Sequence, residues 1–488
     1  MSSKIFPVHW QLRPLSEVVD ALIDYRGKTP KKSEAGIPLV TAKIVKGGVI
    51  LPAAEFIAKS DYDTWMVRGR PKVGDVVVTT EAPLGEVAQI KNENIALAQR
   101  IVTLRGSKDA LLSDYLLYLM QSPFVKEQLE ARSSGSTVKG IKQSELRKIL
   151  LPIPPVDEQE WIGYHLKSID NKIQLNQEIN QTLEQMAQAL FKSWFVDFEP
   201  VKAKIAARER WQARQPENES ASPVCYAAEF DESSALGDLE SYMNRAAMQA
   251  ISGKTAEQLD ALRAEDPEHY NELYETAALF PSAMQESELG ETPEGWEIGS
   301  LSELIEFNPR RTLQKGVLAP YLDMKNVPTS GHLAGEVVQR EMGSGTKFIN
   351  GDTLLARITP CLENGKVAFV DFLEGGEAGW GSTEYIVLRP QSPYPVSLGY
   401  FIARSEKFRA AAIQSMTGTS GRQRADAKLL ASMRWLIYPS LIVERFDRMA
   451  NSYLKLARSF GYQDKALEGI RDALLPKLLS GELACSVL

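Results

Sequence analysis

The stretch PLVTAK at residues 38–43 decides the fold, because the chain repeats it as PYLDMK at residues 320–325. The run PKVGDVVVTTEAPLGEVAQI (71–90) returns as FINGDTLLARITPCLENGKVAFV (348–370), and a Ser/Thr/Gly-rich basic stretch at 133–142 returns at 417–424. The offsets of the three matches lie between 277 and 283 residues. Repeats of solenoid proteins are far shorter, roughly 20 to 50 residues. The matches therefore indicate a duplicated globular domain.

Each copy of this domain carries mixed strand and helix signals. In the first copy, β-branched runs at 76–80 and 101–104 predict strands. Helical spacing of apolar residues predicts a helix over 113–132, with Ser113 or Asp114 as its N-cap. The Pro-rich segment LPIPP at 151–155 forbids continuation of a helix and ends the domain. We expect an α/β (α+β) fold for both copies.

A long amphipathic helix is predicted after each copy. From residue 157 to about 198 there is no proline, and apolar residues follow a heptad pattern with two polar interruptions. A second pattern begins near Val443. The first seam comprises Ile162, Leu166, Ile169, Ile173, Asn176, Asn180, Leu183, Ala187, Leu190 and Trp194. The second comprises Phe446, Met449, Tyr453, Leu456, Phe460, Gln463, Leu467, Ile470 and Leu474.

Two seams of similar length in one chain favour pairing with each other as an antiparallel coiled coil. One repeated domain would then lie at each end, in a pseudo-two-fold arrangement. Asn176 and Asn180 are expected to face Gln463 and to fix the register of the pair. The alternative is that each helix packs only on its own domain.

The predicted domain boundaries follow from these patterns. The first repeated domain covers 1–155, the first helix 156–198, the second repeated domain 295–442 and the second helix 443–488. Residues 199–294 form an acidic connector with helices expected over 256–262 and 270–280. Its expected role is to span the length of the helix pair, so that the second domain reaches the far end.

Charge is distributed unevenly along the chain. The net charge of −7 conceals a connector with 8 Lys+Arg against 20 Asp+Glu, whereas residues 1–156 have 22 against 16 and residues 295–442 have 16 against 14. Both repeated domains are therefore basic. Duplex DNA rewards local neutralisation of its phosphates, whatever the charge of the whole chain. The plainer interpretation is that these small imbalances belong to solvated surface.

The sequence contains no recognisable catalytic motif. Gly343–Lys347 lacks the spacing of a phosphate-binding loop, and Asn308-Pro309-Arg310 lacks the second proline and the aromatic residue of an adenine methyltransferase motif. The four histidines (His9, His165, His269 and His332) and three cysteines (Cys225, Cys361 and Cys485) are scattered without metal-ligand or disulfide spacing. No catalytic or metal site is predicted.

Asp75 and Asp352 are a repeated acidic pair that could be mistaken for an active site. Each follows a glycine in a turn that leads into a strand. Aspartate at such a position commonly accepts a hydrogen bond from its own backbone and closes the turn. We expect both residues to be structural.

The remaining repeated features are basic and polar loops. The loop at 25–32 is echoed at 308–311, Lys43 is echoed by Lys325, and the stretch at 133–142 is echoed at 417–424. Arg and Gln suit base edges, whereas Lys suits phosphates. Exposed basic loops are common, but their recurrence in both copies favours a DNA-binding role. The candidate DNA-binding residues are Arg26, Lys28, Lys31, Lys32, Lys43, Lys139, Lys142, Arg310, Arg311, Lys325, Arg357, Arg422, Gln423 and Arg424.

The whole chain resembles the specificity subunit of type I restriction–modification systems. The resemblance rests on the domain–helix–domain–helix layout and on three segments: LPIPPVDEQEWIGYHLKSIDNKI (151–173), LEQMAQALFKSWFVDFEPVKAK (183–204) and ALEGIRDALLPKLLSGEL (466–483). It implies two target-recognition domains that each read one half of a bipartite site in double-stranded DNA. The helices would set the spacing of the half-sites. The long connector at 199–294 is a departure from the family layout.

The resemblance also implies partners and cofactors. The helices would dock two modification (methyltransferase) subunits that carry S-adenosylmethionine, and two restriction (translocase/nuclease) subunits that use ATP and Mg would join them. This chain itself would bind no cofactor and would not be an enzyme. Its apolar runs fall short of the ~18 residues that a membrane span needs. A cytoplasmic protein that acts in phage defence, without membrane contact, is therefore expected.

Two alternatives from other classes stay open on the sequence. One is a DNA endonuclease with duplicated lobes and an unrecognised active site. The other is a coiled-coil adaptor that does not contact DNA. DNA cleavage by the purified chain would favour the first, and partner binding independent of the basic loops would favour the second.

Overall fold

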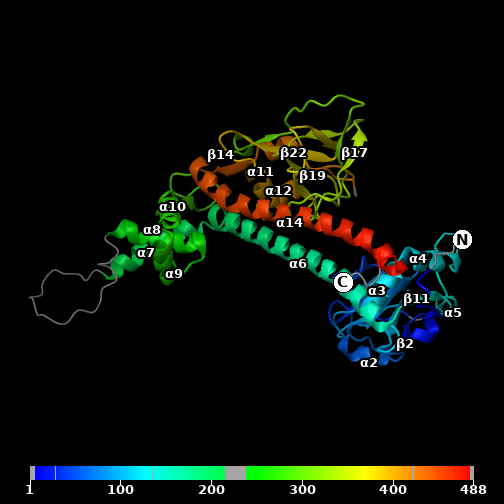
Figure 1. Ribbon diagram of the computed structural model, residues 1–488. Coiled ribbons are helices and arrows are strands. Elements are labelled where there is room, and N and C mark those ends of the chain that lie inside the picture. The colour runs from blue at the N-terminus through cyan, green and yellow to red at the C-terminus, as the bar shows by residue number, and fades with distance from the viewer. Residues whose placement is uncertain (1–5, 28, 136, 215–237, 420–421, 484–488) are drawn as a thin grey trace, which may run out of the picture. The chain divides into compact units, whose positions relative to one another are not determined.

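The structure is a computed structural model that describes residues 6–27, 29–135, 137–214, 238–419 and 422–483 (Figure 1). It divides into two compact units. The first comprises residues 1–176 and 462–488, and the second comprises residues 177–461. Each repeated domain lies in its own unit, and the two units are described in turn.

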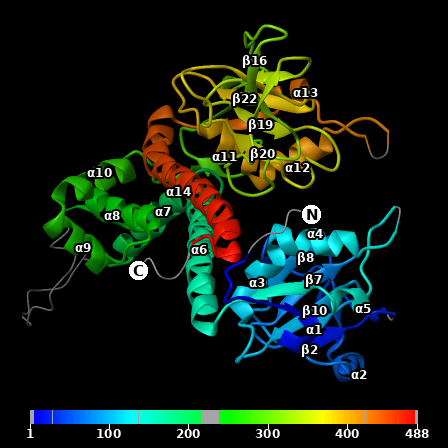
Figure 2. The same ribbon diagram turned by 45° about the vertical axis from the view of Figure 1, so that its right-hand side comes forward.

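The first unit is built on a four-stranded antiparallel sheet. Its strands β2 (Val19–Asp24), β10 (Ile101–Gly106), β7 (Val76–Thr80) and β8 (Leu84–Gln89) lie in the order β2-β10-β7-β8 (Figure 2). Strand β7 consists of β-branched residues that are all buried, because both faces of this central strand are covered. Helix α3 (Ser113–Gln121) and helix α4 (Pro123–Ala131) share a core with one of those faces.

The single helix predicted over 113–132 is two helices. Pro123 cannot donate a backbone hydrogen bond to a preceding turn, so α3 ends at Gln121 and Pro123 occupies the first turn of α4. Ser122 caps α4 by accepting a hydrogen bond from the Val125 N–H. The N-cap of α3 is Leu112, without a side-chain bond, so the predicted cap at Ser113 or Asp114 is wrong.

A second, smaller sheet packs beside the first in this unit. Strand β3 (Ile37–Val40) pairs with β6 (Phe56–Ile57) in antiparallel and with β9 (Ala96–Leu97) in parallel orientation. The strands β1 (Gln11–Pro14) and β11 (Leu150–Ile153) form a separate antiparallel pair, as do β4 (Val45–Lys46) and β5 (Val49–Ile50). The short helical elements are α1 (Leu15–Val18), η1 (Lys59–Asp61), α2 (Tyr62–Trp65) and α5 (Gln143–Leu146).

The second unit repeats this topology. Its main sheet has the order β15 (Ile305–Phe307), β22 (Tyr385–Pro390), β19 (Thr353–Ala356), β20 (Val367–Phe369). Its second sheet has the order β17 (Val338–Glu341), β16 (Leu318–Leu322), β21 (Gly379–Gly381), β18 (Thr346–Phe348), with β16 and β21 parallel. Strands β14 (Glu297–Ser300) and β23 (Arg434–Ile437) pair as β1 and β11 do. Helices α11 (Leu398–Arg404), α12 (Glu406–Gln414) and α13 (Ala427–Ala431) complete the domain (Figure 2). The predicted duplication of an α/β domain is confirmed.

Two long helices follow the repeated domains, α6 (Val156–Phe195) and α14 (Ser440–Ser480). In the first unit, Asp170 of α6 pairs with Arg471 of α14 at 3.0 Å. Asn176, six residues after Asp170, binds Asp464, which lies seven residues before Arg471. In the second unit, the rings of Phe191, Trp194 and Phe195 of α6 surround Phe446 of α14, with centroid distances of 5.3 to 5.9 Å. The helices pair within each unit, and the contacts in the first show that they run antiparallel.

The predicted seam is right for the first helix and is wrong at three of the nine positions of the second, which are exposed. Ile162, Leu166, Ile173, Leu183 and Trp194 are buried, as is the polar Asn176. In α14 the residues buried after Phe446 include Ala450, Leu454, Ala457 and Asp464, whereas the predicted Leu456 and Ile470 are 46% and 50% exposed. The predicted pattern stepped three residues from Phe446 to Met449, but the helix steps four to the smaller Ala450. Asp464, and not the exposed Gln463, is consequently the partner of Asn176.

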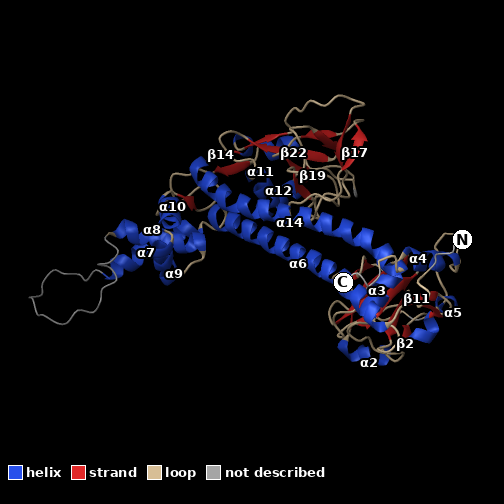
Figure 3. Cartoon of the chain, viewed as in Figure 1, coloured by secondary structure: helices blue, strands red, loops and turns tan. Residues whose placement is uncertain are grey.

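The acidic connector is a packed group of helices. It contains α7 (Glu199–Arg214), α8 (Leu239–Ser252), α9 (Ala256–Glu265) and α10 (Pro267–Ala278), so the two predicted helices are confirmed (Figure 3). Its predicted role as a span along the helix pair is wrong. The Phe198 ring, where the chain leaves α6, lies 5.9 Å from the Trp296 ring, where the second domain begins. The connector therefore leaves and returns at the same point. Strands β12 (Met284–Gln285) and β13 (Thr292–Pro293) lead into the domain, and η2 (Leu301–Glu303) lies within it between β14 and β15.

Candidate nucleic-acid interface

The loops that carry the basic residues of the first domain meet at one end of its main sheet. Strand β2 ends at Asp24 opposite Val102, and β10 begins at Ile101 opposite Thr79. Strand β7 ends at Thr80 opposite Leu84, the first residue of β8. The antiparallel order thus gathers the loop after β2, the residues before β10 and the β7–β8 turn. We call this end of the sheet, with its loops, the first basic edge.

Two further segments join the first basic edge. Gly140 forms a β-bridge with Glu81, and the Ile141 N–H donates to the Thr80 carbonyl at 3.0 Å, which ties the loop at 133–142 to the β7–β8 turn. The carboxyl ends of the parallel strands β3 and β9 also meet, since the Ala98 N–H donates to the Val40 carbonyl at 2.9 Å. Lys43, three residues after β3, is thereby brought close to the start of β10.

A cleft of about 260 Å³ lies at this edge. Two of the predicted residues, Lys32 and Lys43, line it together, although they come from different loops. Its other walls include Gln99 and Arg100, which sequence reasoning did not identify. The full lining is Thr29, Pro30, Lys32, Leu39, Thr41, Ala42, Lys43, Glu55, Ala82, Ala98, Gln99 and Arg100.

The other predicted residues of the first domain differ in their availability. Lys31, Lys43, Lys139 and Lys142 are exposed, and none of them has an ion pair within the part of the chain that the structure describes. Lys32 pairs with Glu55 at 2.9 Å. The Arg26 guanidinium is turned inward, where Nη1 donates to the Ile141 carbonyl at 2.7 Å and Nε pairs with Asp24 at 3.2 Å. Lys28 lies outside the described residues.

The second domain has an equivalent edge. Arg357 directly follows β19, and its N–H donates to the carbonyl of Glu384, the residue before β22, at 2.9 Å. Arg424 forms β-bridges with Ile358 and with Thr417, and the Thr359 N–H donates to the Gln423 carbonyl at 3.1 Å. The loop at 417–424 is therefore tied to the end of β19 as the loop at 133–142 is tied to the end of β7. We call this end the second basic edge.

The second basic edge brings together Arg357, Gln423 and Arg424. Arg424 Nη2 binds Glu384 Oε1 at 2.7 Å, and Arg424 Nε binds Glu384 Oε2 at 2.8 Å. The hydrogen bond from Arg424 holds the pKa of the Glu384 carboxyl below its ordinary value. Arg422 is exposed nearby in sequence, and Lys325, also exposed, follows β16. The Lys325 carbonyl accepts a hydrogen bond from Lys366, the residue before β20, which places Lys325 at the same edge.

Arg310 and Arg311 do not reproduce the loop at 25–32. Asn308 directly follows β15, adopts a left-handed backbone with φ of 53°, and still pairs with Val387 of β22. Arg310 is exposed, but Arg311 is directed into the domain, where Nη2 and Nε bind the two oxygens of Asp352 at 2.7 and 3.0 Å. This carboxylate raises the pKa of Arg311. Arg311 is thus part of the internal structure and not of the basic edge.

Asp75 and Asp352 close their turns as predicted. Asp75 accepts from the Lys72 N–H at 2.8 Å, and Asp352 accepts from the Ile349 N–H at 2.9 Å. Each also binds an arginine of the neighbouring strand, which is Arg105 in β10 for Asp75. For Asp352 it is Arg389 in β22, at 3.3 Å. The repeated acidic pair is therefore a duplicated structural ion pair, at the opposite end of β7 and β19 from the basic edges.

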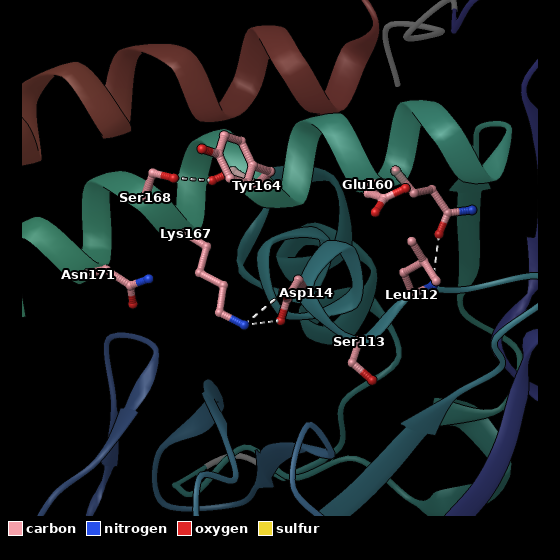
Figure 4. A pocket seen from close by; sticks show the side chains of 9 residues that line it. Leu112, Ser113, Asp114, Glu160, Tyr164, Lys167, Ser168 and Asn171 are labelled. Atoms are coloured by element: carbon pink, nitrogen blue, oxygen red, sulfur yellow. Dashed lines mark hydrogen bonds and ion pairs between the residues drawn. The ribbon is translucent and has the colours of Figure 1, made fainter.

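A separate polar pocket of about 410 Å³ lies between the start of α3 and α6 in the first unit (Figure 4). Lys167 binds both oxygens of Asp114 at 2.8 Å, while Tyr164, Ser168 and Asn171 project from α6 around it. Ser168 donates to the Tyr164 carbonyl at 2.8 Å, and among the described residues that line the pocket no nucleophile is paired with a base. In the described ranges there is also no group of His, Cys, Asp and Glu with metal-binding geometry. Of the cysteines, Cys361 is a free thiol, and Cys225 and Cys485 lie outside those ranges.

Comparison with known proteins gives the class of the chain. Residues 7–185 match the family described as the type I restriction modification DNA specificity domain, so that match covers the first repeated domain and three quarters of α6. The chain is thus similar to the specificity subunits of type I restriction–modification systems, and residues 7–185 carry the match to their specificity domain.

The relatives extend this match along the chain. The specificity subunit of the type I restriction enzyme HindI of Haemophilus influenzae is 29% identical over 427 residues, covering 84% of this chain and 87% of that protein. The MjaIX specificity subunit of Methanocaldococcus jannaschii is 37% identical over 134 residues, covering 26% and 29% of the two chains. Among solved structures, the type I S subunit of M. genitalium is similar with a TM-score of 0.47 and 14% identity, over 98% of this chain and 99% of that one.

No helix within the described ranges is both long enough and apolar enough to cross a membrane. The two longest helices, α6 and α14, carry charged residues throughout their length.

Proposed function

We propose that each repeated domain reads one half of a bipartite site in double-stranded DNA through its basic edge. The observation that carries this proposal is the recurrence of the edge. In both copies the same strand ends and the same tied loop gather exposed cations, although the sequences of the loops differ. The recurrence of both the backbone framework and the exposed positive charge in the two copies favours a shared function of the edges.

The chemistry of the edges suits DNA. Exposed lysines such as Lys31, Lys139 and Lys142 can neutralise phosphates, and release of the condensed counterions then drives binding. Arginine and glutamine side chains at the same edge can hydrogen-bond to base edges in the major groove. Two short readers on one chain combine their selectivity, since each mismatched base pair costs about 1–3 kcal/mol.

The long helices would set the distance between the half-sites and dock two methyltransferase subunits. These partners would carry S-adenosylmethionine, and two restriction subunits would supply the ATP- and Mg-dependent translocase and nuclease. This chain would act in the cytoplasm as the non-catalytic subunit of that complex. The specificity-subunit names of its relatives support this division of labour.

Mapping methylated adenines in a host that expresses this chain with its methyltransferase partner tests the proposal. A strain with the partner alone is the control. The expected result is a chain-dependent motif of two short half-sites around a fixed gap. If the complex forms but no chain-dependent methylation is found, the chain is an adaptor. Cleavage of DNA by the purified chain with a divalent metal would identify a nuclease instead.

Exchange of residues 1–150 for the corresponding domain of a relative tests the independence of the two readers. The exchange point lies in β11, directly after its first residue Leu150, so α6 and the second unit stay intact. One half-site should change and the other should not. A change in both halves would contradict independent reading.

A further inference from the structure

Each basic edge has an arginine paired with a carboxylate. The position that holds the arginine in the first domain holds the carboxylate in the second. The Arg100 carbonyl accepts from the Thr80 N–H at 2.9 Å, just as the Glu384 carbonyl accepts from the Arg357 N–H at 2.9 Å. Arg100 and Glu384 therefore occupy the same place in the framework, one residue before the central strand β10 or β22. One copy has a cation there and the other has an anion.

The loops at 133–142 and 417–424 provide the second position of each arginine–carboxylate pair. Gly140 bridges Glu81 and Ser134 in the first domain, and Arg424 bridges Ile358 and Thr417 in the second, so Gly140 and Arg424 are equivalent. The first domain thus supplies its arginine from the strand start and its carboxylate, Glu81, from the β7–β8 turn. The second supplies its arginine from the loop and its carboxylate from the strand start. At these framework positions each edge has an exposed arginine paired with a carboxylate.

We propose that Arg100 and Arg424 are the specificity-determining residues of the two domains, each reading one guanine in its half-site. This inference rests on the proposed function. The guanidinium group is planar and offers paired donors that match the O6 and N7 acceptors of guanine, whereas the lysines around it are point charges suited to phosphate. Glu81 and Glu384 are positioning residues that hold the guanidinium planes.

The surroundings of Arg100 support a recognition role. Its backbone is left-handed, with φ of 71°, and the neighbouring turn contains Ala82, also left-handed with φ of 50°. Non-glycine residues in this region are strained, and such strain is concentrated at functional sites. The Arg100 side chain is 54% exposed at the cleft, and its Nε lies 3.6 Å from Glu81, so the terminal nitrogens are oriented but still available to a base.

Arg424 meets the same requirements by other means. Glu384 occupies its Nε and Nη2, which fixes the plane of the guanidinium and lowers the conformational entropy that binding would cost. The Arg424 side chain is still 44% exposed, and Nη1 makes no hydrogen bond within the described residues. Nη1 and the second hydrogen of Nη2 form a free edge that can face a base.

The test compares alanine and lysine variants of both arginines in the methyltransferase complex, after the wild-type motif has been mapped. Arg100→Ala should relax one G·C position in one half-site, and Arg424→Ala should relax one G·C position in the other. Discrimination at that position, measured as binding to duplexes with single substitutions, should fall by about 5- to 150-fold. The lysine variants keep the charge but lose the paired donors, so they should lose discrimination while retaining most of the affinity and its salt dependence.

Two exposed arginine–carboxylate pairs elsewhere provide matched controls. Arg70 pairs with Asp63 in the first unit, near Arg105 and the opposite end of β10, and Arg434 pairs with Glu288 in the second unit. Their alanine variants should leave the motif unchanged. Glu81→Gln and Glu384→Gln should weaken discrimination at the same positions as the arginine variants and at no others.

The outcomes separate this inference from the proposed function. If the wild type yields a bipartite motif but Arg100→Ala and Arg424→Ala leave it intact, the inference is wrong and the proposed function stands. Relaxation at a position that is not G·C would overturn guanine reading. If the wild type yields no bipartite motif, both fail.

Discussion

The side-chain amide of Asn176 in α6 donates a hydrogen bond to the carboxylate of Asp464 in α14, with Nδ2 and Oδ1 2.8 Å apart. Both residues are buried. The Asn176 carbonyl oxygen has no hydrogen-bond partner among the described atoms. A polar pair of this kind in an apolar seam fixes the register of two helices at some cost in stability.

Asp464→Asn should stabilise the first unit at neutral pH. Burial raises the pKa of Asp464, although the Asn176 hydrogen bond opposes the shift. Because the pKa of Asp464 is raised in the folded state, its contribution to the stability is fully present below its ordinary pKa of 3.8. That contribution is lost as the pH rises through the pKa of the folded state. The neutral amide avoids this loss, and it also offers a donor to the orphaned Asn176 oxygen.

Thermal unfolding at pH 4 and pH 7 measures the effect. Asp464→Asn should gain about 1 kcal/mol at pH 7 and should lose the pH dependence that this carboxyl contributes. The neighbouring exposed Gln463 provides the control, because Gln463→Ala should change stability by less than about 0.5 kcal/mol. A loss of stability at pH 7 in Asp464→Asn would show that the ionised pair is favourable.

Asp75→Ala and Asp352→Ala should each destabilise their own domain by about 2–3 kcal/mol. Asp75 and Asp352 are 2% and 0% exposed, and removing either leaves an arginine and a turn N–H without their acceptor. Denaturant unfolding measures the loss. Asp63→Ala removes the exposed partner of Arg70 and should cost less than about 1 kcal/mol. Equal effects of Asp75→Ala and Asp63→Ala would refute a structural role for the repeated pair.

Alanine substitution of Lys31, Lys43, Lys139 or Lys142 should weaken DNA binding evenly across sequences. Each lysine that neutralises a phosphate contributes about 0.9 to the slope of log affinity against log salt concentration, so each variant should lower the slope by about that amount. Fluorescence anisotropy of the complex at several salt concentrations checks this. Lys72, exposed at the other end of β7, supplies the control. An unchanged slope in all four variants would place the DNA elsewhere.

Paired insertions in α6 and α14 should change the gap between half-sites and nothing else. Four residues inserted between Asn176 and Gln177, and four between Gly461 and Tyr462, fall at the boundary between the units and preserve the helix pairing inside each. They add about 6 Å to each helix, which corresponds to about two base pairs. Methylation mapping should show the longer gap with both half-sites unchanged.

A single insertion in α6 alone is the informative comparison for that experiment. It shifts the register of one helix against the other, so it should impair folding of the pair and should not yield a clean change in gap length. A new half-site sequence with the original gap, from the paired insertions, would contradict the spacer role.

Sequence periodicity determined those features that depend on neighbours along the chain. The repeat of PLVTAK as PYLDMK predicted two copies of one domain, and heptad spacing predicted α6. The glycine before Asp75 and Asp352 predicted closed turns, because the acceptor and donor are only three residues apart. Local geometry is sufficient for predictions of this kind.

Tertiary structure alone decided which distant residues meet. Arg311 was indistinguishable from Arg310 in sequence, yet it pairs with Asp352, 41 positions away, and is not part of the proposed DNA-binding edge. The comparison of the two sequence repeats did not identify Arg100, because the equivalent residue in the second domain is Glu384. The arginine that pairs with Glu384 is Arg424, which comes from a different loop. The second seam depended on whether α14 placed Met449 or Ala450 against its partner. Sheet pairing and side-chain packing fix these choices through contacts between residues far apart in the chain, and no local pattern records them.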